Sequence, residues 1–195
     1  MSASVEALKA ELERFGKEND AAKTARAERM LNITRDTGEL LSVLARAMAA
    51  RRILEIGTSN GYSTLWLAEA AKATGGKVTT VEASQFKIDL AAANFARSGL
   101  ASLIDLIHDD AGRFLERARP GAFDLVFLDS ERSEYPRWWP RLDAALRPGG
   151  LLVVDNASSH AAEIAPLVAL VGGDPRYETC MVPAGNGEYL AVKSA

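Results

Sequence analysis

Acidic and amide side chains recur at the ends of short apolar segments that have the composition of β-strands. They are Glu82, Asp109-Asp110, Asp129 and Asp155-Asn156. The carboxyl ends of parallel strands meet along one edge of a sheet, and open α/β sheets bind their ligands outside that edge. The sequence therefore predicts a row of carboxylates that could hold hydroxyl groups, an amino group or a cation.

The first predicted strand ends on a glycine turn instead of an acid. Ile53–Ile56 has a strand's composition, Gly57 follows at once, and a helical pattern begins near Tyr62. A strand that stops on glycine and opens a helix directs backbone N–H groups at one point, which suits a nucleotide-like ligand. The intervening Thr58–Gly61 lacks Gly-x-Gly-x-x-Gly spacing and adds polar side chains. This favours a zwitterionic nucleoside over a pyrophosphate, and an ordinary strand–helix turn is the alternative.

Glu82 ends the next predicted strand and indicates a ribose. A carboxylate at this place can accept hydrogen bonds from both ribose hydroxyls, as the corresponding acid does in NAD enzymes. Glu82 therefore predicts an adenosine ribose without identifying the cofactor; a surface acid at a strand end is the alternative. Asp110 could bind an adenine amino group, cap the following helix, or do both.

Asp129, Asp155 and Asn156 predict a cation site. The strands before them are expected to be neighbours, so three oxygen ligands would converge with no His or Cys among them. Such ligands suit a hard divalent cation that keeps open positions for water and substrate. Magnesium is the default, with manganese or calcium as alternatives. The opposing interpretation is a strand-end cap at Asp129 and a turn at the other two. Two neighbouring carboxylates repel each other, so we expect a cation or an arginine beside them.

The order of the predicted elements places these residues on one α/β sheet. From Arg52 onward strands alternate with helices, and the predicted strands are Ile53–Ile56, Lys77–Val81, Leu103–Ile107, Phe123–Leu128 and Leu151–Val154. This alternation predicts a doubly wound, mostly parallel sheet with right-handed crossovers. The last two strands, Tyr177–Val182 and Glu188–Val192, flank a loop too short for a crossover. They predict an antiparallel C-terminal hairpin that completes seven strands.

Helical spacing accounts for most of the remaining chain. The predicted helices after Arg52 are Tyr62–Ala73, Gln85–Ser98 capped by Ser84, Gly112–Arg119, Pro136–Leu146, and one from Ser158 or Ser159 to about Val171. Before Arg52 we expect helices from Val5 to Gly16, over Ala21–Leu31, and over Thr37–Ala50 with Asp36 as N-cap. We find no repeat or linker and expect one domain, 1–195, with 1–50 packed on it. These extra helices would cover the cofactor mouth or contact a second subunit.

Composition excludes several classes of protein. The 195 residues are 48% apolar and 25% charged, with a net charge of −3, which argues against a nucleic-acid protein held by phosphate contacts. The chain has no apolar segment long enough to span a bilayer and no signal-peptide core, so we expect no membrane partner. The single Cys180 cannot form an internal disulfide, which fits the cytoplasm. We expect it to be a small buried residue of a strand.

Six blocks of sequence resemble the cation-dependent O-methyltransferases that use S-adenosylmethionine. This is the family of catechol and caffeoyl-CoA O-methyltransferases, and the likeness is closest to its small bacterial members. The blocks are LEIGTSNGYS at Leu54–Ser63, VEAS at Val81–Ser84, DDAGRFL at Asp109–Leu115, DLVFLDSERSEY at Asp124–Tyr135, LRPGGLLVVDN at Leu146–Asn156, and the hairpin ending in Lys193. They cover about residues 30–193. The resemblance implies a class I methyltransferase fold, which is Rossmann-like, and a homodimer.

The resemblance also implies roles for individual residues. Glu55, Gly57 and Ser63 would hold the methionine part of S-adenosylmethionine, and Glu82 would hold its ribose. The remaining cofactor-binding residues would be Asp110 and Ala111 at the adenine, Ile33 closing over the cofactor, and Asp129. The metal ligands would be Asp129, Asp155 and Asn156. The metal would bind two vicinal oxygens of a catechol-like substrate and lower the pKa of one hydroxyl.

Arg132 departs from the family pattern. The family has a lysine at this position, three residues after the first metal-binding aspartate, and that lysine takes the acceptor's proton. Arginine stays protonated, so Arg132 cannot be the general base. It could hold a substrate carboxylate or phosphate, stabilise the oxyanion, or replace the metal by neutralising Asp129. The base would then be metal-bound water, a neighbouring acid, or none. His160 could reach the mouth, or it is a surface histidine.

Three functions remain open on the sequence. The first is an S-adenosylmethionine-dependent O-methyltransferase of a small hydroxylated aromatic compound. The second is a related cofactor-binding protein without metal-dependent catalysis, which Arg132 would permit. The third is an NAD-dependent oxidoreductase, which the sheet would permit although the chain lacks Gly-x-Gly-x-x-Gly.

Two further groups have structural explanations: Trp138-Trp139 as a core or subunit contact, and Arg113, Arg117 and Arg119 as a solvated face.

Overall fold

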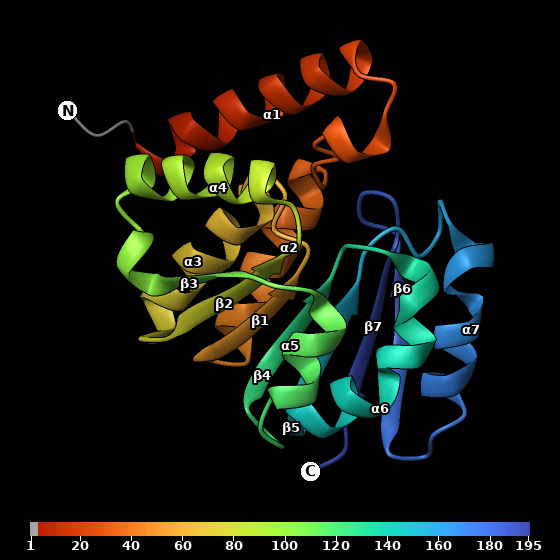
Figure 1. Ribbon diagram of the computed structural model, residues 1–195. Coiled ribbons are helices and arrows are strands. Elements are labelled where there is room, and N and C mark those ends of the chain that lie inside the picture. The colour runs from red at the N-terminus through yellow and green to blue at the C-terminus, as the bar shows by residue number, and fades with distance from the viewer. Residues whose placement is uncertain (1–3) are drawn as a thin grey trace.

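The computed structural model describes residues 4–195 and builds them around one seven-stranded sheet (Figure 1). The strand order is β3-β2-β1-β4-β5-β7-β6, in which β7 runs antiparallel to both β5 and β6 and the other pairs are parallel. The strands are β1 Arg52–Ile56, β2 Lys77–Glu82, β3 Ile104–His108, β4 Phe123–Leu128, β5 Leu146–Val154, β6 Tyr177–Val182 and β7 Glu188–Lys193. The predicted doubly wound sheet with its antiparallel hairpin is confirmed.

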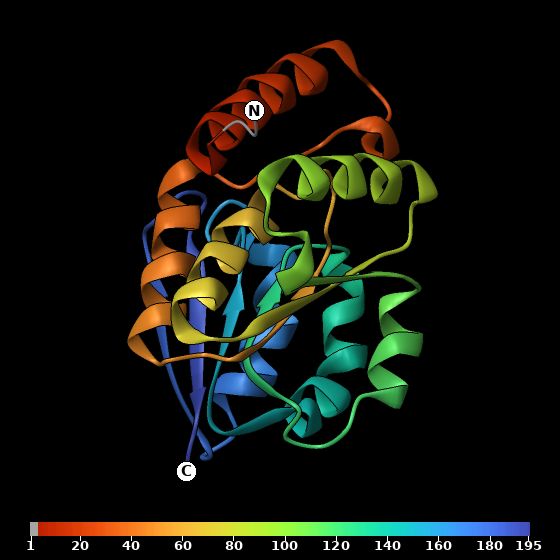
Figure 2. The same cartoon turned by 90° about the vertical axis from the view of Figure 1, so that its left-hand side faces the viewer.

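Helices cover both faces of the sheet (Figure 2). The helices are α1 Val5–Ala22, α2 Arg35–Ala47, α3 Tyr62–Thr74, α4 Gln85–Ser98, α5 Ala111–Arg117, α6 Tyr135–Ala145 and α7 Ala161–Gly172. Side chains of β4 alternate between two cores, because successive residues of a strand point to opposite faces. Leu125 and Phe127 pack under α1–α4, whereas Val126 and Leu128 pack under α5–α7.

The predicted helix over Ala21–Leu31 is wrong. α1 continues to Ala22, and only a short 3-10 turn, Arg26–Glu28, follows it. The Asp20 carboxylate accepts hydrogen bonds from the backbone N–H groups of Met30 (2.6 Å) and Leu31 (2.9 Å). These side-chain bonds replace helical ones, and Leu31 takes a positive φ of 51°.

The N-cap of α2 is Thr34 and not Asp36. The Thr34 hydroxyl accepts from the backbone N–H of Thr37, which starts the helix at Arg35. Asp36 instead accepts from the backbone N–H of Gly185 at 2.8 Å. The start of α2 is thereby attached to the loop between β6 and β7.

The expectation for Cys180 is wrong, whereas that for Trp138 and Trp139 is confirmed. Cys180 is exposed and not buried, because β6 is the edge strand and most of its residues face solvent. Trp138 and Trp139 are both buried against the core under α5–α7, as expected for core residues. Among the described helices none has the length and apolar character needed to cross a bilayer.

Lys9 attaches α1 to the rest of the fold. Its side chain is only 2% exposed, and its ammonium lies 3.3 Å from the centroid of the Trp66 ring. The ammonium also forms ion pairs with Glu69 (2.8 Å) and Glu6 (3.0 Å). A buried cation over an aromatic face, with carboxylate partners, stabilises the contact between α1 and α3.

Lys9→Met should therefore destabilise the protein. The substitution keeps the length of the side chain but removes the charge, and we expect a loss of about 1–3 kcal/mol in the free energy of unfolding. Urea denaturation measures it, with Lys17→Met on the exposed side of α1 as control. Equal stability of the Lys9→Met variant and the natural protein would show that the buried contact contributes nothing.

Candidate cofactor and cation site

The glycine turn brings the carboxyl ends of β1 and β4 into contact. Gly57 has φ +103°, and a Cβ added there would lie 2.0 Å from the backbone oxygen of Asp129. Its N–H donates to the carbonyl of Val81 at 3.0 Å, which ties the turn to β2 as well. Only glycine fits this close approach, so the loop Gly57–Gly61 lies directly beside Asp129.

Glu82 is held at the mouth of this turn by two backbone donors. The N–H of Ser59 donates to Glu82 Oε2 and that of Ser84 donates to Oε1, both at 2.9 Å. Each carboxylate oxygen can accept two hydrogen bonds, so each keeps acceptor capacity for a hydroxyl group. The sequence-predicted ribose carboxylate thus lies beside the glycine turn with a fixed orientation.

The Glu55 carboxylate lies inside the molecule and accepts hydrogen bonds from three hydroxyl groups. It is fully buried and accepts hydrogen bonds from Ser63 Oγ (2.6 Å), Thr80 Oγ1 (2.6 Å) and Thr64 Oγ1. Burial raises the pKa of Glu55 to about 7, although these hydroxyls favour its ionised form. Ser63 is 6% exposed, so it is the more accessible member of this predicted cofactor-binding pair.

This raised pKa predicts a pH dependence of stability. An acid whose folded pKa lies above its unfolded value stabilises the fold at low pH, so the contribution is lost as the pH rises from 4.5 through about 7. The stability advantage of the natural protein over Glu55→Gln should shrink by on the order of 3 kcal/mol across that interval. Urea denaturation of both proteins at several pH values measures it. A constant difference would show that Glu55 titrates at its ordinary pKa.

The residues predicted at the adenine and the closing segment also have structural roles. Asp110 is the N-cap of α5 and accepts from the N–H of Arg113 at 3.0 Å, and Ala111 is the first residue of that helix. Ile33 is buried in the core under α1–α4. Near it, the carbonyl of Met30 accepts from Ser59 Oγ at 2.7 Å, so the segment before α2 is bonded to the glycine turn.

Asp129, Asp155 and Asn156 meet at the ends of β4 and β5. The Asn156 amide nitrogen lies 2.7 Å from Asp155 Oδ2 and 3.3 Å from Asp129 Oδ1, so it faces both carboxylates. Asn156 has a positive φ of 65°, a conformation that Asn tolerates better than most residues. The structure thus brings together the three residues that the sequence predicted as cation ligands.

The electrostatics of this cluster require a positive partner or protons. Burial raises the pKa of Asp129 well above its usual range and Asp155 raises it further, while burial also raises the pKa of Asp155. Asp155 Oδ1 is buried without a hydrogen-bond donor among the described residues, unless the neighbouring Glu188 carboxyl is protonated and donates to Asp155. A cation bound by Asp129 and Asp155 would neutralise the buried negative charges and would give the buried Asp155 oxygen a partner.

Asp129, Asp155 and Asn156 fit a hard cation if the Asn156 side chain presents its amide oxygen. Within residues 4–195, no three His, Cys, Asp or Glu side chains form a metal-binding group, so a third ligand must come from another residue type. A half-turn of the Asn156 amide would exchange its nitrogen for its oxygen at nearly the same position. The two carboxylates and this amide oxygen would then present three hard donors.

Comparison with known proteins assigns the chain to a family. The family model described as O-methyltransferase matches residues 1–194. The chain belongs to the O-methyltransferase family. A catechol O-methyltransferase of Mycobacterium tuberculosis is 37% identical over 141 residues, which are 71% of this chain and 60% of that relative. A putative O-methyltransferase of Mycobacterium sp. (strain JLS) is 32% identical over 89% of this chain and 87% of its own length.

Solved structures agree with the family. A putative O-methyltransferase from Klebsiella pneumoniae has a TM-score of 0.80 at 27% identity and covers 94% of this chain and 90% of its own. An O-methyltransferase from Bacillus cereus in complex with SAH has a TM-score of 0.79 at 25% identity, covering 96% and 91%. With the catechol and caffeoyl-CoA relatives, these matches confirm the resemblance found in the sequence.

In this O-methyltransferase family member, Arg132 lies beside the acid cluster without bonding to Asp129. Its side chain is 8% exposed, and its Nε donates to Glu163 Oε2 of α7 at 2.8 Å. Its charge lowers the pKa values of Asp129 and Asp155, but less than burial raises them. A direct replacement of the metal by the guanidinium is therefore not the arrangement found here.

Glu188 is a buried acid of the site that the sequence analysis missed. It is fully buried, and its Oε1 accepts from Thr37 Oγ1 of α2 at 2.8 Å. Burial, and then the nearby Asp155, raises the pKa of Glu188 to about 9. The acids that the sequence predicted for the site all follow the carboxyl ends of predicted strands, whereas Glu188 begins an antiparallel strand. The pairing of Val154 with Tyr189 places that beginning at the carboxyl edge of β5.

The loop between β6 and β7 covers this edge of the site. The Asn186 carbonyl accepts from the N–H groups of Ser158 and Ser159, and its amide donates to Asn156 Oδ1 at 3.3 Å. α7 consequently starts at Ala161 and not at Ser158 or Ser159. His160 is partly exposed at the N-cap position of α7 beside Ser159, and its charge lowers the pKa values of Asp155 and Glu163.

Proposed function

We propose that the protein is an S-adenosylmethionine-dependent O-methyltransferase of a small hydroxylated aromatic compound, assisted by a divalent cation. The observation that carries the proposal is the contact between Gly57 and Asp129. It joins a nucleoside-type turn, with the oriented Glu82 carboxylate, to the oxygen-lined cluster of Asp129, Asp155 and Asn156. The methyl donor would therefore lie on one side of this backbone contact and the acceptor on the other, next to each other.

The chain's own residues would hold S-adenosylmethionine along the glycine turn. Glu82 would accept from the ribose hydroxyls, and Ser63 with the Glu55 network would face the methionine part. Asp110 and Ala111 would lie at the adenine. The SAH bound by the Bacillus cereus relative and the S-adenosylmethionine bound by Streptomyces achromogenes TomG support this ligand class.

Asp129, Asp155 and Asn156 would hold the cation. When bound, a divalent cation supplies a Lewis acid that lowers the pKa of an acceptor hydroxyl. Arg132 cannot accept the proton. Held by Glu163 beside the cluster, its charge would stabilise an anionic acceptor oxygen.

A methyl-transfer assay tests the proposal. Protein with S-adenosylmethionine labelled in its methyl group is incubated with a panel of catechols and monophenols, with magnesium and with chelator. Label should appear in a catechol and should require the cation. No transfer to any phenol, despite tight cofactor binding, would instead support the non-catalytic alternative that Arg132 permits.

The oxidoreductase alternative loses support on two observations. The family match is to methyltransferases. The chain does contain one Tyr-x-x-x-Lys spacing, Tyr189 to Lys193, but it lies within β7, and Lys193 Nζ donates to the backbone carbonyl of Asp143 at 2.6 Å. This lysine thus has a structural role. The homodimer, the cytoplasmic location and the absence of nucleic-acid and membrane partners stay predictions.

A further inference from the structure

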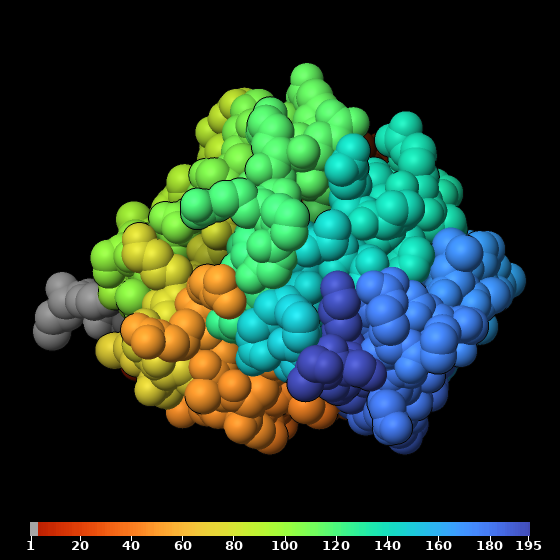
Figure 3. Space-filling model, turned by 90° about the horizontal axis from the view of Figure 1, so that it is seen from below, coloured from red at the N-terminus to blue at the C-terminus, as the bar shows by residue number. Residues whose placement is uncertain are grey.

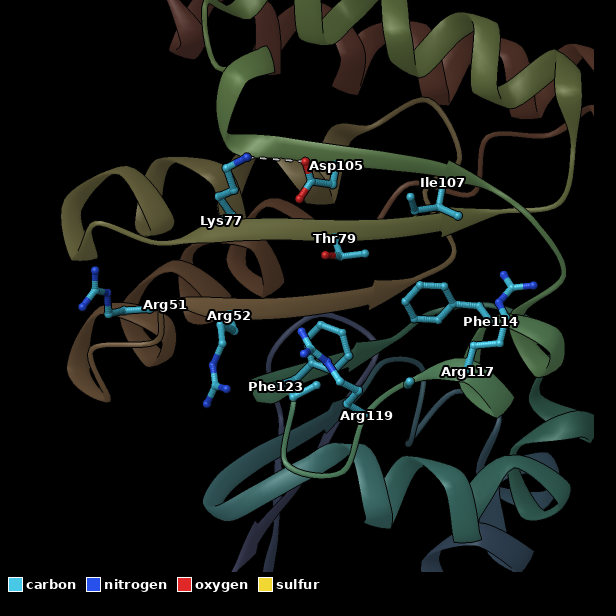
Figure 4. Close-up of a pocket in the computed structure, with 12 residues that line it drawn as sticks. Arg51, Arg52, Lys77, Thr79, Asp105, Ile107, Phe114, Arg117, Arg119 and Phe123 are labelled. Atoms are coloured by element: carbon cyan, nitrogen blue, oxygen red, sulfur yellow. Dashed lines mark ion pairs between the residues drawn. The ribbon is translucent and has the colours of Figure 1, made fainter.

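A second concave site lies at the opposite edge of the sheet from the glycine turn. It has a volume of about 490 Å³ and lies between the amino-terminal parts of β1 and β2, strand β3, and the segment from α5 to β4 (Figure 4). In the view from below, the start of β1 and the segment before β4 lie next to each other (Figure 3). The end of the groove at Arg51 and Arg52 and the cofactor turn are at opposite ends of β1, about 17 Å apart for a five-residue strand, while Ile107 extends the groove along β3 toward the carboxyl edge.

The groove exists because α5 is short. α5 has seven residues and is about 10 Å long, whereas β2 has six residues and extends about 20 Å. The helix therefore leaves part of the sheet face uncovered. Thr79 of β2 and Ile107 of β3 line the uncovered part and are only partly buried.

Positive charge gathers around this groove although the chain is net negative. The charged lining residues are Arg51, Arg52, Lys77, Arg117, Arg119 and a single acid, Asp105. Arg117 is paired with Asp109, and Lys77 lies 3.6 Å from Asp105. Arg52 shares the Asp124 carboxylate with Arg147. Within residues 4–195, Arg51 and Arg119 form no ion pair, so the groove keeps an excess of positive charge that an anion would satisfy.

Two aromatic rings give the groove an apolar part. Figure 4 shows Arg52, Arg119 and Phe123 gathered at one end, with Phe114 and Arg117 at the other. Phe123 is 9% exposed and Phe114 is partly buried. The volume lies within the range of small-molecule sites, about 300–1,000 Å³. Guanidinium groups match phosphate oxygens, and an aromatic face accepts a stacked ring.

We propose that this groove binds a phosphorylated aromatic small molecule of the nucleotide class. The phosphate lies at Arg119, which forms no ion pair within residues 4–195, beside Arg52, whose guanidinium also pairs with Asp124, and the ring lies against Phe114. The site is separate from the cofactor site, because none of the residues that line it is among the proposed cofactor-binding residues. Its ligand also differs in kind, since neither the methyl donor nor its demethylated product carries a phosphate. The proposal does not depend on the methyl-transfer activity.

Isothermal titration calorimetry of the full chain with AMP, ADP and inorganic pyrophosphate tests this site. ADP should bind at one site, and binding should weaken as salt is raised. Arg119→Glu should weaken binding by about tenfold or more, since it replaces a donor by a like charge. Arg141→Glu, an exposed arginine of α6 outside the groove, makes the same change of charge and should leave the affinity unchanged.

Two further measurements test whether the aromatic ring of the ligand contributes to binding and whether the groove is independent of the cofactor site. Phe114→Leu keeps an apolar side chain and should weaken AMP but not pyrophosphate. Saturating SAH should not displace ADP. The proposal is overturned if ADP shows no saturable binding at millimolar concentration, if Arg119→Glu and Arg141→Glu behave alike, or if SAH competes.

Discussion

Asp155→Ala is expected to abolish cation-dependent methyl transfer while cofactor affinity stays nearly unchanged. Asp155 is 3% exposed, contacts the Asn156 amide, and has a buried oxygen that no donor reaches unless the neighbouring Glu188 is protonated. Removing it leaves Asp129 as the only carboxylate of the three proposed ligands. We expect turnover with magnesium to fall by at least about 100-fold, which corresponds to a loss of about 2.7 kcal/mol of transition-state stabilisation.

Cation and cofactor binding must be measured beside turnover. Calorimetry should show weaker manganese binding but an unchanged affinity for SAH, because Glu82 and the glycine turn are untouched. The unliganded variant should be at least as stable as the natural protein, since a buried carboxylate beside Asp129 has been removed. Asp89→Ala, an exposed acid on α4, is the matched control. Full activity of Asp155→Ala, or of the natural protein in chelator, would contradict the cation's role.

Glu82→Ala should weaken binding of S-adenosylmethionine by about 10- to 100-fold, or about 1–3 kcal/mol, as loss of a charged hydrogen-bond partner does. The same carboxylate accepts from Ser59 and Ser84, so part of the effect would come from a looser glycine turn. Glu82→Gln keeps one acceptor oxygen and should give an intermediate affinity. Calorimetry with SAH measures all three proteins.

A matched variant controls for charge in this experiment. Glu116 is an exposed acid on α5, and Glu116→Ala should bind SAH like the natural protein. Manganese binding should survive Glu82→Ala, because Asp129 and Asp155 remain. Unchanged SAH affinity in Glu82→Ala would place the ribose elsewhere.

The central sheet was predictable because its strands carry strong local signals. Phe123–Leu128 is almost entirely apolar and is buried throughout, as a strand covered on both faces must be. The sequence also predicted that Gly57 and Glu82 lie close together, because they follow two successive parallel strands whose ends share one edge of the sheet. β5 begins earlier than expected, since Leu146 already pairs with Phe123 before the irregularity at Pro148–Gly150.

The errors have a common cause in contacts between distant parts of the chain. Asp20 ends the helical path by capping Met30 and Leu31, and Asp36 serves the distant Gly185 instead of its own helix. Glu188 became part of the acid cluster only through the pairing of β5 with β7. Local spacing carries no information on such pairings, which tertiary structure decides.

Calorimetric titration of the purified protein with SAH, S-adenosylmethionine and NAD tests the central claim most directly. The account predicts one binding site for SAH and S-adenosylmethionine, weakened in Glu82→Ala, from which NAD displaces neither ligand. Displacement of SAH by NAD, or no binding of either sulfur nucleoside at millimolar concentration, would contradict it.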